Sequence, residues 1–200
     1  MTVVLPDIES HVSIQADRPM NDEEFFEFCA KNENLRIERE ANGEIVIMPP
    51  AGFETGYRNN EICRQLATWA RGDGRGVALD SNTEYILPNG AARAPDASWV
   101  LRSRLAAFTR KQKERFLPLC PDFVVELTSP SDRLPKVKAK MREWMENGAA
   151  FSWLVDPKRR TVYVYRQGQE PEELVDVDHV VGEAPVAGFR LDLVEIWQGL

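Results

Sequence analysis

Residues 121–146 read PDFVVELTSPSDRLPKVKAKMREWME and contain the patterns of a strand, a loop and a helix. The centre of the stretch, FVVEL, is β-branched and apolar, which is typical of a strand covered on both faces. Pro135 suits the first turn of a helix that we expect to run to about Asn147. The apolar side chains that recur along this helix are Val137, Met141, Trp144 and Met145. A buried strand followed by an amphipathic helix indicates a fold that mixes the two.

The neighbouring segments also alternate between strand and helix patterns. Towards the N-terminus we expect a helix over 20–34, a hairpin around Asn42-Gly43, a helix over 57–71 and short strands within 77–80, 83–87 and 96–101. Towards the C-terminus, 151–156 and 161–166 form another strand pair. This order predicts an α/β or α+β fold, with a mixed central β-sheet flanked by helices and preceded by an N-terminal helix and hairpin. We expect residues 1–19 to be a loose leader and 20–200 to form a single domain.

Composition and length limit the class of protein. The chain has 200 residues, a net charge of −7 and three cysteines far apart, Cys29, Cys63 and Cys120. This number and spacing argue against a disulfide framework or a zinc knuckle, so we expect reduced thiols. No apolar run approaches the roughly 20 residues of a membrane span. The first 19 residues lack the basic and apolar regions of a secretion signal, so a cytoplasmic protein is expected.

Positive charge is concentrated in two segments of this acidic chain. Residues 102–116, where we expect a helical insertion, hold six cations against Glu114 alone, and 132–142 hold five against Asp132. A local basic surface is compatible with contact to phosphate groups. A solvated helix face explains the same pattern almost as well.

Two carboxylates at the ends of apolar strands are the strongest candidates for chemistry. Asp96 lies at the start of the strand DASWVL, and Glu126 lies inside FVVEL. An ionised glutamate in such a strand is costly unless it is paired or binds a metal. Because two converging carboxylates suit Mg²⁺, they could form a site for phosphodiester hydrolysis if their strands are neighbours. On the following helix Lys136 and Lys140 share one edge of the apolar stripe, with Lys138 at the other edge, and a cation of this helix could point back to the site and stabilise negative charge.

The same residues also have a structural interpretation. A buried glutamate and a lysine on the next helix can simply form a structural ion pair, and an aspartate at a strand end often caps a turn. The pattern alone favours neither interpretation.

The stretch from Thr55 to Trp197 resembles the Uma-type restriction endonuclease family, a part of the wider PD-(D/E)XK nuclease superfamily. The motifs that carry the resemblance are TGYRNNEI, DSNTEYILPNGAARAPDASWV, LCPDFVVELTSPSDR, a K-x-x-x-W ahead of NGA, and WLVDP followed by VYVYR. The motifs occur in order over about two thirds of the chain. The resemblance implies a restriction endonuclease-like fold.

The resemblance also implies Mg²⁺-dependent phosphodiester hydrolysis, with Mn²⁺ as a substitute, and Asp96 and Glu126 as metal ligands. In the wider fold the lysine lies two residues after the glutamate, where this chain has Thr128. The family places it on the following helix, where Lys140 is the match and Lys136 a weaker substitute. Glu61 matches the carboxylate that many such nucleases contribute from their first core helix, although an exposed helix glutamate is an equal alternative.

Two functions of different classes follow. The first is a DNA endonuclease, acting on duplex DNA as a homodimer. The second is a catalytically weak or inactive domain that keeps the nuclease fold for nucleic-acid binding or assembly. The intact set of Asp96, Glu126 and Lys140 favours the first, whereas the acidic net charge favours the second. Trp99, Trp144 and Trp153 fall in apolar patterns, so we expect them in the core.

Overall fold

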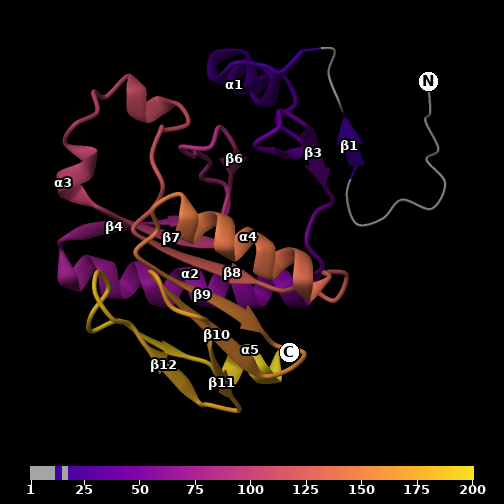
Figure 1. Cartoon of the computed structure of the whole chain (residues 1–200). Helices are drawn as coiled ribbons and strands as arrows, with labels where there is room; N and C mark the ends of the chain where they lie inside the picture. Colours follow the sequence, from indigo (N-terminus) through magenta and orange to yellow (C-terminus); the bar gives the residue numbers. More distant parts are fainter. Residues whose placement is uncertain (1–11, 15–17) are drawn as a thin grey trace.

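The central β-sheet has six strands in the order β11-β10-β9-β8-β7-β4 (Figure 1). In the computed structural model, which describes residues 12–14 and 18–200, these strands are β4 (Gly76–Asp80), β7 (Ala97–Leu101), β8 (Phe123–Leu127), β9 (Phe151–Asp156), β10 (Thr161–Arg166) and β11 (Glu172–Val175). Strand β8 pairs parallel with β9 and antiparallel with β7. The central sheet is therefore mixed, as the sequence predicts.

The helices are α1 (Asp22–Lys31), α2 (Phe53–Asp73), α3 (Arg102–Leu105), α4 (Leu134–Glu146) and α5 (Val194–Gln198), with a 3₁₀ turn over Gln112–Glu114. The two longest, α2 and α4, cover opposite faces of the central sheet (Figure 1). Helix α4 connects β8 to its parallel neighbour β9, which is the usual way to join parallel strands.

Alternation along β8 sends its side chains into two cores. Val125 and Leu127 pack on the face covered by α2. Val124 packs on the other face, together with Trp144 of α4. Because Glu126 follows Val124 in this alternation, its carboxyl lies on the α4 side. The three tryptophans expected in the core, Trp99, Trp144 and Trp153, are fully buried.

A second sheet lies above one end of the central sheet. Its strands, in the order β1-β3-β2-β6-β5, are β1 (Val12–Ile14), β3 (Ile45–Met48), β2 (Arg36–Arg39), β6 (Ala92–Arg93) and β5 (Tyr85–Ile86). Phe25 of α1 packs against Ile37, Ile45 and Ile86 of this sheet. Residues 49–52 then lead from β3 into α2. A small third sheet pairs β12 (His179–Val181) with β13 (Arg190–Asp192).

The hairpin prediction is confirmed, and local sequence features bound the neighbouring helices. Helix α1 begins after Asn21 with a capping box formed with Glu24. The β2–β3 hairpin turns at Asn42-Gly43, where Gly43 takes a positive φ of 87° that glycine adopts without strain. Helix α2 ends at Gly74, in the left-handed conformation.

Other segments differ from the prediction. Val12–Ile14 were expected within a loose leader but pair with β3 as strand β1; residues 1–11 and 15–17 of that leader lie outside the described part of the chain. The segment 102–116 has only the four-residue α3 and the 3₁₀ turn, because too few apolar side chains recur at helical spacing to hold a longer helix. Helix α2 begins at Phe53, four residues before the expected Tyr57; the apolar pattern did not reveal this first turn, because FETG carries no apolar stripe. None of the described helices has the length and apolar character to cross a membrane.

Candidate active site

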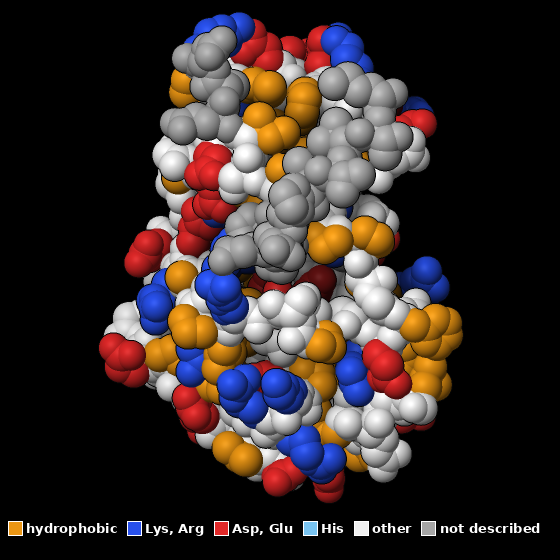
Figure 2. All heavy atoms as spheres, turned by 90° about the vertical axis from the view of Figure 1, so that its right-hand side faces the viewer, with side chains coloured by type: hydrophobic (Ala, Val, Ile, Leu, Met, Phe, Trp, Pro, Cys, Tyr) orange, Lys and Arg blue, Asp and Glu red, His pale blue; other side chains and the backbone are white. Residues whose placement is uncertain are grey.

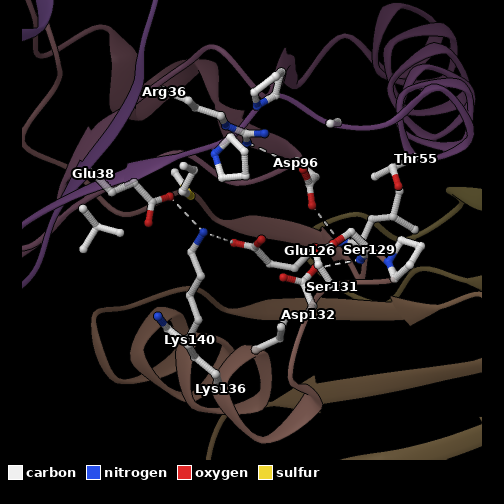
Figure 3. A pocket seen from close by; sticks show the side chains of 18 of the residues that line it. Arg36, Glu38, Thr55, Asp96, Glu126, Ser129, Ser131, Asp132, Lys136 and Lys140 are labelled. Atoms are coloured by element: carbon white, nitrogen blue, oxygen red, sulfur yellow. Dashed lines mark hydrogen bonds and ion pairs between the residues drawn. The ribbon is translucent and has the colours of Figure 1, made fainter. Parts of the chain in front are cut away.

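A cavity of about 800 Å³ opens between the second sheet and the end of the central sheet (Figure 3). Its walls come from the β2–β3 hairpin, residues 49–55, the loop 129–132 and α4. Asp96, Glu126 and Lys140 all lie in it, so the structure brings together three of the four residues that the sequence singled out. Figure 2 shows acidic side chains in the recess between the upper part of the molecule and its base.

Asp96 and Glu126 face each other across two neighbouring strands. In the antiparallel register of β7 and β8, Ala97 lies opposite Val125, so Asp96 and Glu126 are the next pair in that register. The Asp96 Oδ2 atom accepts a hydrogen bond from the Leu127 amide at 2.8 Å. The two carboxyls that the sequence separates by thirty positions therefore converge at one end of the central sheet.

The Glu126 carboxyl is held by two donors on α4. Its Oε1 atom accepts a hydrogen bond from the Trp144 indole at 2.8 Å and lies 3.0 Å from the Lys140 ammonium. Residues 140 and 144 are one helical turn apart, so both reach the same oxygen. Both donors therefore contact the same oxygen of the Glu126 carboxylate.

Both carboxyls are poorly hydrated and bind protons more tightly than usual. Burial raises the pKa of Glu126 to about 7, and Asp96 and Glu38 add to the rise while Lys140 opposes it. Burial also raises the pKa of Asp96, opposed by Arg36 and by the Leu127 amide. A divalent cation would favour the charged form of both groups.

Lys140 bridges two carboxylates from different sheets. Its ammonium lies 2.9 Å from Glu38 Oε1 of β2 and 3.0 Å from Glu126 Oε1 of β8 (Figure 3). Burial alone would favour the neutral amine, but Glu126 and Glu38 outweigh it and raise the pKa of Lys140. The lysine is therefore charged at any physiological pH.

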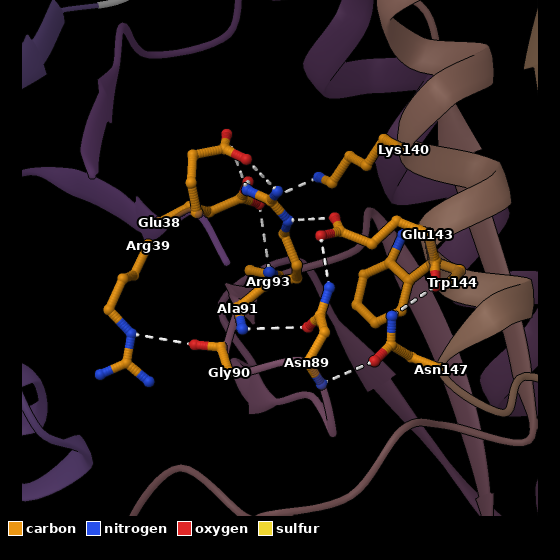
Figure 4. Close-up of polar contacts among 12 residues, drawn as sticks. Glu38, Arg39, Asn89, Gly90, Ala91, Arg93, Lys140, Glu143, Trp144 and Asn147 are labelled. Carbon is orange, nitrogen blue, oxygen red and sulfur yellow. Dashed lines mark hydrogen bonds and ion pairs between the residues drawn. The ribbon is translucent and has the colours of Figure 1, made fainter. Parts of the chain in front are cut away.

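Arg93 of β6 fixes the hairpin relative to α4. Its guanidinium binds Glu38 at 3.2 Å, Glu40 at 2.5 Å and Glu143 at 2.7 Å (Figure 4). Glu143 lies on the same helix as Lys140, three residues later. The Glu38 carboxylate therefore pairs with two cations, Arg93 and Lys140. This network of ion pairs orients the Lys140 side chain.

Glu61 is the candidate that the structure does not bring to the cavity. Its carboxylate binds Arg64 and Gln65 of the same helix, and Gln65 in turn binds the Asp192 carbonyl near the C-terminus. It is nearly buried, so the exposed alternative does not hold either. Among the described residues that line the cavity, α2 contributes its first turn, including Thr55, and not Glu61.

Lys136 lines the cavity as well, whereas Thr128 is not among the described lining residues. The Thr128 amide instead extends the pairing of β8 with β9 by binding the Val155 carbonyl. Among the described lining residues, the cations therefore come from α4 and from the second sheet.

Sequence reasoning missed three residues of this site: Arg36, Glu38 and Trp144. Arg36 and Glu38 alternate with apolar residues in LRIERE, a pattern that usually marks a solvated face, but here that face closes the cavity. Trp144 was expected only in the core, and its indole N–H was the one available signal, since a buried tryptophan usually has an acceptor.

The donor set of the cavity fits a hard divalent cation. Within residues 12–14 and 18–200, no group of three or more histidine, cysteine or carboxylate side chains is arranged to hold a metal ion. Mg²⁺ needs no such cluster, because one or two carboxylates suffice when water and substrate phosphate complete its shell. Asp96 and Glu126, which are oxygen donors only, therefore suit Mg²⁺ or Mn²⁺ better than zinc.

The fold is that of a restriction endonuclease-like protein. The profile of the Uma2 family, described as "Putative restriction endonuclease", matches residues 22–194, and the chain belongs to this family. The crystal structure of a "putative nuclease belonging to DUF820" from Anabaena variabilis is similar, with a TM-score of 0.70 and 20% identity over 90% of this chain and 98% of that one. At this identity the likeness shows the fold. A search of curated proteins gives no match.

Proposed function

We propose that the chain is a Mg²⁺-dependent DNA endonuclease whose site consists of Asp96, Glu126 and Lys140. The observation that carries this proposal is the convergence of the two carboxyls at adjacent strand ends, with the Lys140 ammonium 3.0 Å from Glu126. Membership of the Uma2 family and the nuclease-type fold support it.

Each residue has a distinct role in this proposal. Asp96 and Glu126 would hold the ion, which when bound supplies Lewis acidity and a nucleophilic water of lowered pKa. Lys140 remains charged beside them, so it can orient the attacking water and stabilise the negative charge that develops on the phosphate. Trp144 fixes Glu126 Oε1 and so orients the carboxylate.

The raised pKa of Glu126 gives the site a pH dependence. Below about 7 this carboxyl is protonated and holds a cation poorly. Metal binding and cleavage should therefore increase as the pH rises through about 7, with protons released on binding.

A direct test incubates the purified chain with single-stranded and plasmid DNA in Mg²⁺, Mn²⁺ or EDTA at pH 8. We expect cleavage with either metal and none in EDTA. Cleavage that continues in EDTA would contradict the metal requirement, and binding without cleavage in any metal would favour the alternative of a nuclease-fold binding module. The homodimer stays a prediction, which analytical ultracentrifugation can check.

Trp144 offers a test of the site that does not depend on turnover. Trp144→Phe keeps an aromatic ring but removes the hydrogen bond to Glu126, and we expect Mn²⁺ to bind about 10-fold more weakly in calorimetry. Trp153→Phe is the matched control, because Trp153 is equally buried and its indole nitrogen has no hydrogen-bond partner within the described residues. Equal weakening in both variants would mean that ring volume, and not the indole donor, matters.

A further inference from the structure

Phe53 is unusual among the aromatic residues of this chain. It is 83% exposed, whereas each of the other eight phenylalanines is buried or half-buried. An exposed phenylalanine gains nothing for the fold, since its ring stays in water. Its place in the molecule is specific, because it lines the cavity that holds Asp96 and Glu126.

Phe53 continues an apolar wall. Met48, Pro49, Pro50 and Ala51 precede it along the chain and line the same cavity. Apolar side chains are visible beside the acidic recess in Figure 2. One wall of the cavity is therefore apolar and carries an exposed ring, while its floor carries the carboxylates. This combination suits a ligand with a flat apolar part and a charged part.

The depth and charge of the cavity limit the size of that ligand. The Glu126 side chain is only 7% exposed, so a phosphate must enter the cavity to reach it. Among the described residues, seven carboxylates and four cations line the cavity. A duplex would hold many phosphates against this acidic rim, whereas a single unpaired nucleotide would bring one phosphate to the site. Enzymes that act on a nucleotide inside an enclosed pocket take single-stranded or extruded substrate, because the target atom cannot be reached within a duplex.

We infer that the cavity takes an unpaired nucleotide of the DNA substrate, with its base stacked on Phe53 and its phosphate directed towards Asp96 and Glu126. This inference rests on the proposed function and narrows the substrate to single-stranded or locally opened DNA. Aromatic stacking tolerates any base, so little sequence preference is expected at this nucleotide. Intact duplex, which the sequence led us to expect, is then the weaker substrate.

The test measures binding separately from cleavage. The background is Asp96→Asn with Glu126→Gln in EDTA, because removing both charges lets DNA bind without metal. Fluorescence anisotropy compares a labelled 12-nucleotide strand with a hairpin duplex of the same sequence. We expect the single strand to bind more tightly, and Phe53→Ala to weaken it by about 5-fold or more.

Two further variants control this measurement. Phe53→Trp should retain binding of the single strand, since it keeps a ring for stacking. Val175→Ala should leave binding unchanged, because Val175 is exposed on β11 and does not line the cavity among the described residues. Equal affinity of Phe53→Ala and the background protein, or tighter binding of the duplex, would overturn the inference.

Cleavage by the wild-type chain separates this inference from the proposed function. Metal-dependent cutting that is faster on the single strand supports both. Faster cutting of the duplex supports the nuclease and overturns the role of Phe53. Stacking that depends on Phe53, without cleavage in any metal, supports the nucleotide site and overturns the nuclease.

Discussion

Replacing Lys140 with methionine is expected to lower metal-dependent cleavage by about 10²- to 10³-fold, the usual effect of removing one charge-stabilising donor. Methionine keeps most of the apolar length of the side chain but removes the ammonium that lies 3.0 Å from Glu126. Single-turnover cleavage at saturating Mg²⁺ measures the loss, because it separates the chemical step from metal binding and product release.

The same substitution should also destabilise the fold in a pH-dependent way. It removes the cation shared by Glu38 and Glu126, and breaking a buried ion pair costs about 3 kcal/mol. The pKa of Glu126 is already raised above its ordinary value and would rise further. A carboxyl with a raised pKa stabilises the folded state at low pH, and this contribution decreases as the pH rises. The decrease in the free energy of unfolding caused by Lys140→Met should therefore be larger at pH 8 than at pH 5, as measured by urea unfolding.

Lys138→Met is the matched control for this prediction. Lys138 lies on the same helix, pairs with Glu173 at 3.2 Å and rests over the ring of Tyr163. Its ammonium is not part of the carboxylate site, so cleavage should stay close to wild type. A similar loss of cleavage in both variants would show that α4 needs its positive charge in general and that Lys140 has no special role.

The strand and helix at the centre of the site were predictable because their patterns are local. The β-branched centre of β8 and the apolar spacing of α4 are each set by neighbours in sequence. Glu126 stood out because a charge inside such a strand needs an explanation. Lys140 then followed from its place on the next helix, together with the family resemblance.

Glu38 could not be predicted in the same way. Whether the charged face of LRIERE meets water or a cavity depends on where the hairpin is placed, and that depends on contacts distant in sequence. Arg39 pairs with Ala92, and Arg93 ties the hairpin to Glu143 of α4. These contacts join segments about fifty residues apart. The pattern of neighbouring residues in the sequence cannot predict such contacts.

Glu61 shows how a motif match differs from geometry. The sulfur of Cys63 lies 3.4 Å from the Asp96 carbonyl, so this side of α2 faces the start of β7. Glu61 is two residues earlier, which is about 200° around the helix. Its side chain must therefore point away, and it does so towards Arg64. The family resemblance pointed to this helix, but it did not determine on which side of the helix Glu61 lies.

Replacing both carboxyls, by Asp96→Asn with Glu126→Gln, is expected to reduce metal-dependent cleavage by more than about 10³-fold. The ion loses its two protein ligands, and the several kcal/mol of charge stabilisation that it supplies are lost with it. Mn²⁺ calorimetry should show no binding at this site. Thermal unfolding should no longer respond to Mn²⁺ at pH 8, whereas the wild type should be stabilised.

Glu61→Gln is the control that separates the proposed ligands from a buried glutamate in general. Like Glu126 it is nearly buried, but it pairs with Arg64 away from the cavity, so cleavage and Mn²⁺ binding should persist. Loss of Mn²⁺ binding in this variant would contradict the site as we describe it.

The double variant should also be at least as stable as the wild type without metal at pH 8. The raised pKa of Glu126 means that its contribution to stability is present below about 4.5 and is lost as the pH rises through about 7. Neutral amides of the same shape avoid that loss, and the amide oxygen introduced by Glu126→Gln can still accept the Trp144 hydrogen bond. We therefore expect a gain of roughly 1–3 kcal/mol in the free energy of unfolding at pH 8 and little change at pH 5. A double variant less stable than the wild type at pH 8 would show that the carboxyls stabilise the fold as an ion pair with Lys140. A gain in stability together with a loss of metal binding is the result that a functional site predicts, because such sites keep charges that the fold alone would not favour.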